Sequence, residues 1–148
     1  MIKKKAVPNK VKKTAPLSER GITAKSPTSE PAIRIVMMPR DTNPVGSIFG
    51  GHILSLIDLA AGQHARSVAP KRYVTKVIRE VVFIAPVFVG DSVSFYTKTE
   101  RVGNTSISVL VEVEATRGVD LLTTMKVTSA EVVMVAVDKK LKPIKILG

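Results

Sequence analysis

The sequence contains no cysteine and no tryptophan, and its 148 residues include only four phenylalanines and two tyrosines. Because cysteine is absent, disulfides, thiolate metal ligands and a cysteine nucleophile are excluded, and a reducing compartment is a natural setting. The few aromatics mean that the core must be built from Val, Ile, Leu and Ala. A chain of this length suits one domain that buries roughly two-thirds of its unfolded surface.

Long apolar runs are also missing. No stretch approaches the roughly 18 residues that a membrane-spanning helix needs. The N-terminus is basic, but no apolar stretch of the kind found in secretory signals follows it. No set of Asp, Glu and His has a recognised metal-ligand spacing, and neither a Ser-His-Asp order nor a phosphate-binding glycine loop is visible. We expect a cytoplasmic protein without a membrane span, a metal or a cofactor.

The net charge of +11 is unevenly distributed. Residues 1–34 hold +7 of it and residues 35–148 only +4. Residues 1–29 are rich in Lys, Pro, Ser and Thr without apolar periodicity, which predicts a basic, disordered tail before a domain at residues 30–148. Such a tail is most often solubilising, although it leaves contact with nucleic acid or an anionic membrane open. The mildly basic domain gives no reason to expect nucleic-acid binding.

The domain reads as one strand, one apolar helix and four further strands. The helix is expected at about residues 51–68, and the strands at residues 31–38, 73–84, 92–101, 105–116 and 122–137. Short turns rich in Gly, Asn and Asp between alternating strands predict an antiparallel meander. The dry face of such a sheet needs a cover, and only this helix can supply it. The predicted class is α+β, with the sheet wrapped around the helix.

One carboxylate interrupts the apolar helix. The stretch from His52 to Ala65 reads HILSLIDLAAGQHA, and Asp58 is its only formally charged residue. At about 100° per residue its neighbours on the helix surface include Ala61, Gly62 and Ala65, which leave space for a ligand or another chain. Low local polarity suits a carboxylate to act as a general base. Asp58 can instead accept hydrogen bonds from a neighbouring strand or subunit, or face solvent.

Two glycines, Gly50 and Gly51, precede the predicted helix. The first amides of a helix have no partner inside it, and glycine allows a ligand to approach them closely. Together with the helix dipole they suit the polarisation of a carbonyl oxygen. A tight turn explains the pair equally well.

The two histidines carry less information. His64 lies on the apolar face of the helix with Ile53 and Ile57, where a partly buried histidine with satisfied hydrogen bonds is expected rather than a ligand. His52 lies in the first helical turn and can line a site there.

The stretch Met38–Asp58, MPRDTNPVGSIFGGHILSLID, closely resembles the signature of the acyl-CoA hydrolases of the hotdog superfamily. Weaker matches follow at residues 82–91, 103–106 and 135–143, so the resemblance covers about residues 31–146. It implies a hotdog fold, in which a five- or six-stranded antiparallel sheet wraps around one long helix. It also implies homodimers with a continuous sheet, often assembled as trimers of dimers. The active sites would lie between subunits, bind coenzyme A thioesters and use no cofactor.

The same resemblance assigns roles to individual residues. The helical aspartate of the family, a general base or nucleophile, matches Asp58. The amides that polarise the thioester carbonyl match the Gly50–His52 segment, with Gly51 and His52 as the donors. Asn43 and Ser47 would help to position water or the thioester. Ser47 is a departure, because relatives commonly have Asn or Asp there, and serine is shorter and has no carboxylate.

Coenzyme A also has phosphates, which require cations or amides. Gly50 can approach the ligand closely, and Thr105 and Ser106 can contact the pantetheine arm or a phosphate. The basic candidates on the domain are Lys76, Arg79, Arg101 and Lys126.

Thioester hydrolysis is the function that the resemblance favours: acyl-CoA and water would give a free acid and coenzyme A. The alternative is a hotdog domain that binds acyl-CoA as a sensor without turning it over. A hydratase is disfavoured, since it needs an Asp/His pair. His64 lies about 240° around the helix from Asp58, so the two cannot cooperate within one chain.

Overall fold

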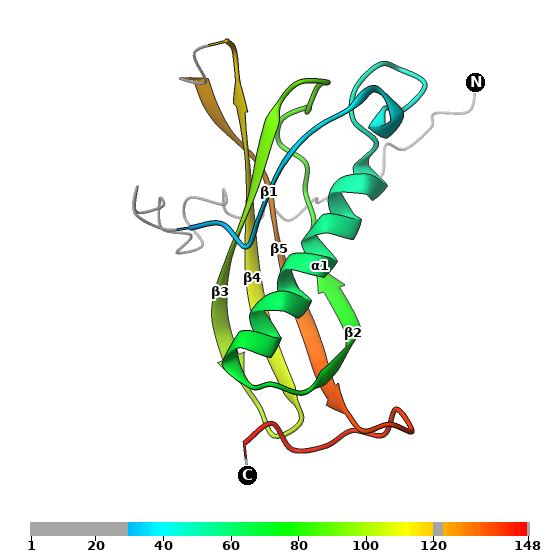
Figure 1. The fold of residues 1–148 in the computed structure, drawn as a ribbon, viewed down its shortest axis with the longest axis vertical. Coiled ribbons are helices and arrows are strands. Elements are labelled where there is room, and N and C mark those ends of the chain that lie inside the picture. The colour runs from blue at the N-terminus through cyan, green and yellow to red at the C-terminus, as the bar shows by residue number, and fades with distance from the viewer. Residues whose placement is uncertain (1–29, 120–122, 148) are drawn as a thin grey trace, which may run out of the picture.

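The computed structural model describes residues 30–119 and 123–147. The predicted tail at residues 1–29 lies outside these ranges. The described chain forms one helix, α1 (Gly50–Val68), a short 3-10 turn at Pro39–Asp41 and a single five-stranded sheet (Figure 1). The strands are β1 (Ile33–Val36), β2 (Arg72–Arg79), β3 (Ser92–Val102), β4 (Ser106–Arg117) and β5 (Thr123–Val137).

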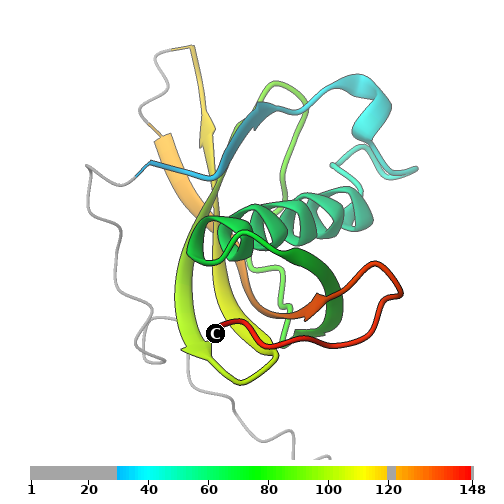
Figure 2. The same cartoon turned by 60° about the horizontal axis from the view of Figure 1, so that its bottom comes forward.

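Helix α1 forms where the sequence has helical periodicity, and its apolar stripe faces the sheet. Its buried residues are Ile53, Leu56, Ile57, Ala60, Ala61 and Ala65. Burial of each isoleucine contributes about 2 kcal/mol to folding. The helix stops before Pro70, where the Ala69 amide donates to the Ala65 carbonyl at 3.0 Å. Figure 2 shows the sheet curving around the helix, as the predicted hotdog fold requires.

The opposing face of the sheet supplies the rest of the core. Strand β4 alternates residue by residue, with five buried side chains toward the helix: Ile107, Val109, Val111, Val113 and Ala115. Strand β5 adds Ala130, Val132, Met134 and Ala136 from register-matched positions. The core is therefore mainly aliphatic, as the composition predicts, with Phe95 as its largest fully buried side chain.

The strand order corrects one prediction. Strands β3, β4 and β5 form the expected antiparallel meander, but β2 pairs with β5 and β1 pairs with β3, which gives the order β1-β3-β4-β5-β2. The predicted strand at residues 73–84 is also too long, because β2 ends at Arg79 and Glu80 has a left-handed φ of 52°. Residues 80–91 are a connection that carries the chain from one side of the sheet to the other.

This connection is fixed by an ion pair at its end. The buried carboxylate of Asp91 accepts hydrogen bonds from Arg117 at 2.9 and 2.7 Å and from the Phe88 amide at 2.9 Å. Burial alone would raise the pKa of Asp91, but these hydrogen bonds and the Arg117 charge hold it below its ordinary value. Arg117 also donates to the Pro86 carbonyl and covers the Phe88 ring at 4.7 Å. Residues 86–91 are thus anchored to β4.

A register shift in β2 changes which way its side chains point. Thr75 pairs with Met134, a residue of the helix-facing set, whereas Val77 pairs with Val133 on the outer face. The extra residue between them, Lys76, makes this a β-bulge. As a result the first half of β2 presents Thr75 to the helix, and the second half presents Val77 and Arg79 to the outer face of the sheet.

Candidate active site

Asp58 lies midway along α1, partly buried and beside an outer strand of the sheet. The hydroxyl of Thr75 on β2 donates a hydrogen bond to its Oδ1 atom. The sequence predicted open space on this side of the helix, and Thr75 occupies part of it. Asp58 therefore has a partner on a neighbouring strand, which is one of the alternatives that the sequence leaves open. Within residues 30–119 and 123–147, no hydrogen bond involves its Oδ2 atom.

The start of α1 presents two amides. Gly50 and Gly51 are the first two helical residues, so their N–H groups have no acceptor inside the helix. The next amide is already used, because His52 N–H donates to the Phe49 carbonyl at 3.0 Å. A Cβ atom on Gly51 would lie 2.4 Å from the Phe49 ring, so glycine is what lets this ring pack over the helix start. At the start of the helix, the amides of Gly50 and Gly51 are therefore available to donate to a ligand, and the amide of His52 is not.

The loop before the helix is organised by Asn43. Its Oδ1 accepts the amides of Val45 and Ser47 at 3.0 and 3.1 Å, and its Nδ2 donates to the Ser47 hydroxyl at 2.8 Å. The backbone amide of Asn43 also donates to the Ser47 carbonyl at 2.8 Å. Asn43 thus fixes the loop geometry, and the Ser47 hydroxyl keeps its own proton free to donate.

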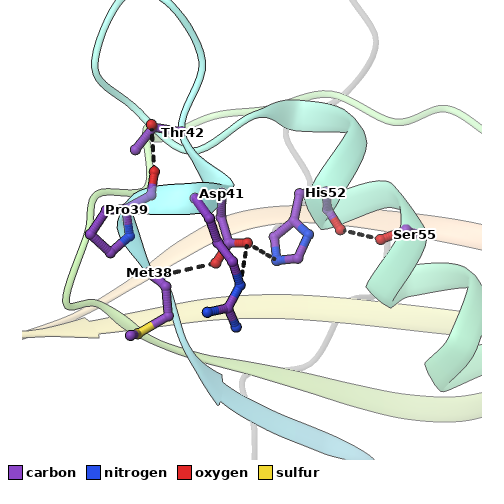
Figure 3. Close-up of polar contacts among 7 residues, drawn as sticks. Met38, Pro39, Asp41, Thr42, His52 and Ser55 are labelled. Atoms are coloured by element: carbon purple, nitrogen blue, oxygen red, sulfur yellow. Dashed lines mark hydrogen bonds and ion pairs between the residues drawn. The ribbon is translucent and has the colours of Figure 1, made fainter.

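The side chain of His52 turns toward the 3-10 segment (Figure 3). Its Nε2 atom lies 3.5 Å from Oδ1 of Asp41, whose other oxygen accepts the Met38 amide at 2.9 Å. This contact joins the segment before the helix to its first turn. Nothing in this arrangement directs the imidazole toward Asp58.

His64 behaves as the sequence predicts. Its two ring nitrogens lie 2.9 and 2.8 Å from the hydroxyls of Thr97 and Thr99 on β3, so both are satisfied. Burial lowers its pKa. His64 joins the C-terminal half of the helix to β3 and is separate from Asp58.

An apolar pocket of about 370 Å³ opens beside the start of α1. The loop, the helix and the β2–β3 connection each supply one wall. Its lining residues are Ser47, Ile48, Gly50, Ile53, Phe83, Ile84, Ala85, Pro86 and Val87. Two residues of the predicted site, Ser47 and Gly50, therefore share a cavity whose other walls are apolar.

A second pocket, of about 260 Å³, lies on the outer face of the sheet next to the β3–β4 turn. It brings together five of the residues predicted to contact coenzyme A: Lys76, Arg79, Arg101, Thr105 and Ser106. Arg79 also pairs with Glu131 at 3.3 Å. Lys126 lies elsewhere. It is on β5, opposite Glu114 of β4, and is roughly 20 Å along the strand from Val133 in the pocket wall.

Sequence reasoning missed two parts of this arrangement. Thr75 looks like an ordinary strand residue, and only the pairing of β2 beside α1 brings its hydroxyl to Asp58. Residues 83–87 were predicted partly as strand, so their role as a pocket wall was not foreseen. The Pro86 in this segment was the available signal, because proline cannot donate to a sheet ladder.

Residues 30–119 and 123–147 include neither a candidate metal site nor a candidate membrane-spanning helix. They contain no group of three or more His, Asp or Glu side chains arranged to hold a metal ion. In the same ranges, α1 is not apolar enough over its length to qualify as a membrane span.

Comparison with known proteins shows the family to which the chain belongs. The family model described as the thioesterase superfamily matches residues 45–121. An uncharacterized acyl-CoA thioester hydrolase of Zymomonas mobilis is 40% identical over 82% of this chain and 80% of its own length. The acyl-CoA thioester hydrolase YciA of Salmonella typhimurium is 37% identical over 80% of this chain and 90% of its own.

Solved structures give the same family. A hexameric hotdog fold thioesterase of Campylobacter jejuni is 51% identical, with a TM-score of 0.75 over 80% of this chain and 90% of its own. A hexameric broad specificity acyl-coenzyme A thioesterase is 33% identical, with a TM-score of 0.76 over 84% and 85%. The chain therefore belongs to the thioesterase superfamily, among its hotdog-fold acyl-CoA thioester hydrolases.

Proposed function

We propose that this protein hydrolyses acyl-CoA to a free carboxylic acid and coenzyme A, with Asp58 as its central catalytic residue. Water would add its oxygen to the thioester carbonyl carbon, the carbon–sulfur bond would break, and the sulfur would leave with a proton as the thiol. The observation that carries this proposal is the carboxylate of Asp58, held by Thr75 beside an outer strand in a member of this family.

Asp58 would act as the general base that activates water, or as the nucleophile that attacks the carbonyl. Thr75 donates to one of its oxygens, which fixes the carboxylate and leaves the other oxygen for the reaction. The amides of Gly50 and Gly51 would stabilise the oxyanion, because unpaired N–H groups at a helix start are aligned with its dipole. Ser47, held by Asn43, would donate to water or to the thioester.

One chain cannot bring these groups to the same thioester. Asp58 is seven residues beyond Gly51, which corresponds to about 10 Å along the helix axis. A carbonyl that accepts from Gly51 is therefore out of reach of the Asp58 of the same chain. A second copy would solve this if its helix ran antiparallel beside the first, with Asp58 of each copy facing the amides of the other.

The outer strand β2 suits such a pairing, because it ends the sheet directly beside Asp58. A homodimer joined there would have one continuous sheet and two shared sites. Three such dimers would form a hexamer, and the hotdog thioesterase of Campylobacter jejuni is hexameric. We therefore expect a homodimer as the smallest active unit and a trimer of dimers as the complete assembly.

The second pocket, on the outer face of the sheet, would hold the phosphates of coenzyme A. Lys76, Arg79 and Arg101 provide positive charge, and Thr105 and Ser106 provide hydroxyl donors in the same cavity. Lys126 lies outside this pocket and would not contact the phosphates. The reaction requires only water, and the cytoplasmic location remains a prediction from the sequence.

The test is a free-thiol release assay with acyl-CoA substrates of increasing chain length, on the natural protein and on Asp58→Asn. This substitution keeps the shape of the side chain and removes its basicity. We expect the natural protein to turn over and the variant to lose at least about a hundredfold in kcat. Binding of coenzyme A without turnover of any thioester would contradict the enzyme and favour the sensor. Turnover that survives the substitution would move the catalytic centre away from Asp58.

A further inference from the structure

The apolar pocket beside the helix start has one aromatic wall, Phe83. Its Cε2 and Cζ atoms lie 3.6 Å from where a Cβ atom on Gly50 would be, so the ring lies close against the first helical residue. The side chain is 43% exposed, which sets it apart from the buried core residues. An aromatic ring half open to solvent at the mouth of an apolar cavity is well placed to contact a ligand.

The wall that holds Phe83 is fixed on both sides. The amide of Ile84 donates to the Val127 carbonyl on β5 at 2.8 Å, and the Val87 carbonyl accepts the Ile48 amide at 2.8 Å. One residue before Phe83, the Val82 carbonyl accepts the Thr128 hydroxyl at 2.7 Å. The space in the pocket therefore depends on its side chains and not on the course of the loop.

The pocket changes from polar to apolar along its walls. Ser47 and the backbone of Gly50 form the polar part, while Ile48, Ile53 and Val87 are buried apolar residues. A ligand that fits has a polar group next to an apolar chain. A thioester is such a ligand, since its carbonyl needs amide donors and its acyl chain needs an apolar wall.

We propose that this pocket receives the acyl chain and that Phe83 determines which chain lengths the enzyme accepts. The inference rests on the thioester hydrolysis proposed above. With its carbonyl oxygen at the Gly50 and Gly51 amides, the acyl chain passes under the Phe83 ring toward Ile53. A cavity of about 370 Å³ is near the small end of ligand pockets, which span roughly 300–1,000 Å³, so short and medium chains fit best.

The experiment measures kcat/KM on the complete protein for acyl-CoA substrates from about two to about sixteen carbons, in steps of about two carbons. Phe83→Ala enlarges the pocket, Phe83→Leu enlarges it less, and Phe83→Trp fills it. The matched control is Phe88→Ala, because Phe88 is in the same connection and 40% exposed, but its ring packs under Arg117 and does not line the pocket. Thermal melting and size-exclusion chromatography accompany each variant.

We expect Phe83→Ala to raise the ratio of long-chain to short-chain kcat/KM by about tenfold or more. Phe83→Leu should give a smaller shift, Phe83→Trp the opposite shift, and Phe88→Ala no shift. An unchanged chain-length profile in folded Phe83 variants would overturn this inference alone. A change in oligomer size with an unchanged profile would also overturn it, because a second copy would then be the occupant. Absence of turnover by the natural protein would overturn thioester hydrolysis as well.

Discussion

The two pockets differ in almost every physical respect. The pocket at the helix start is lined by apolar side chains on a backbone fixed by hydrogen bonds, whereas the pocket on the outer face is lined by long cationic side chains and hydroxyls. A rigid apolar wall selects by shape, and flexible cations attract charge without demanding one geometry. The two pockets together suit a substrate that has an apolar end selected by its length and a charged end recognised by cations, such as an acyl-CoA.

Removal of the Thr75 hydroxyl should affect neither pocket and should give the largest effect among these four tests. In Thr75→Val the shape is kept, but Asp58 loses a hydrogen bond to its carboxylate. Hydrogen bonds to charged groups contribute about 1.5–3 kcal/mol, so we expect kcat to fall roughly ten- to hundredfold with little change in KM. Steady-state kinetics would check this. Thr75→Ser should recover most of the rate. A change in KM with an unchanged kcat in Thr75→Val would contradict the assignment.

Asp91→Asn breaks the anchor of the rigid wall. It removes the ion pair with Arg117, and we expect the free energy of unfolding to fall by about 2 kcal/mol at pH 7. For a chain of this size that corresponds to roughly 4–8 °C in melting temperature. Urea unfolding and thermal melting would measure the two quantities.

The pH dependence gives this prediction its control. Because the folded-state pKa of Asp91 is lowered, its contribution is present above the unfolded pKa of about 4 and is lost as the pH falls through the lower folded value. The difference in stability between the natural protein and Asp91→Asn should therefore be full at pH 7 and shrink progressively as the pH falls below about 4. A constant difference across this range would rule out the ion pair as the cause.

Arg101→Gln weakens the charge-based pocket. Among the described residues Arg101 forms no ion pair, whereas Arg79 pairs with Glu131. Loss of the Arg101 charge should therefore mainly weaken binding of the ligand. We expect KM for acyl-CoA to rise about tenfold with kcat nearly unchanged. The difference should shrink at high ionic strength, where charges are screened. Lys126→Gln, outside the pocket, serves as the control, and an equal effect there would contradict a localised phosphate site.

Ser47→Ala should have the smallest effect. The substitution removes a hydroxyl that accepts from Asn43, but the backbone hydrogen bonds between residues 43 and 47 remain. We expect kcat to fall only about two- to fivefold. Ser47→Asn, which supplies a residue that the family resemblance implies at this position, tests whether the amide raises the rate. A loss of a hundredfold in Ser47→Ala would instead make this hydroxyl part of the chemistry.

The local sequence pattern predicted correctly which faces of α1 and β4 are buried. The periodicity of α1 placed Ile53, Ile57 and Ala61 on its buried face, and the alternation of β4 identified the core side of Val109 and Val111. These assignments need only the geometry of one element. The single apolar helix predicted that the sheet wraps around it, the hotdog resemblance implied the same fold, and the observed sheet agrees with both.

Features that depend on distant pairing were not available from the sequence. The contact of Thr75 with Asp58 requires that β2 lie beside α1, and the chain passes from β2 to the far side of the sheet before β3 begins. The same holds for the wall at residues 83–87, whose apolar letters are equally consistent with a strand. By contrast, Arg101, Thr105 and Ser106 line one pocket because they are near neighbours in the sequence, and their contact with coenzyme A stays a prediction.

The single extra residue at Lys76 gives β2 a change of parity. Before it, the odd-numbered positions face the helix, where Thr75 contacts Asp58, and after it, the odd-numbered positions face the outer side of the sheet, where Val77 and Arg79 line the second pocket. One strand therefore contributes to both places, and a shift of its register would change both at once. Deleting Lys76 would invert every side chain on one side of the deletion. The bulge at Lys76 thus determines which side chains of β2 face the helix and which face the outer side of the sheet.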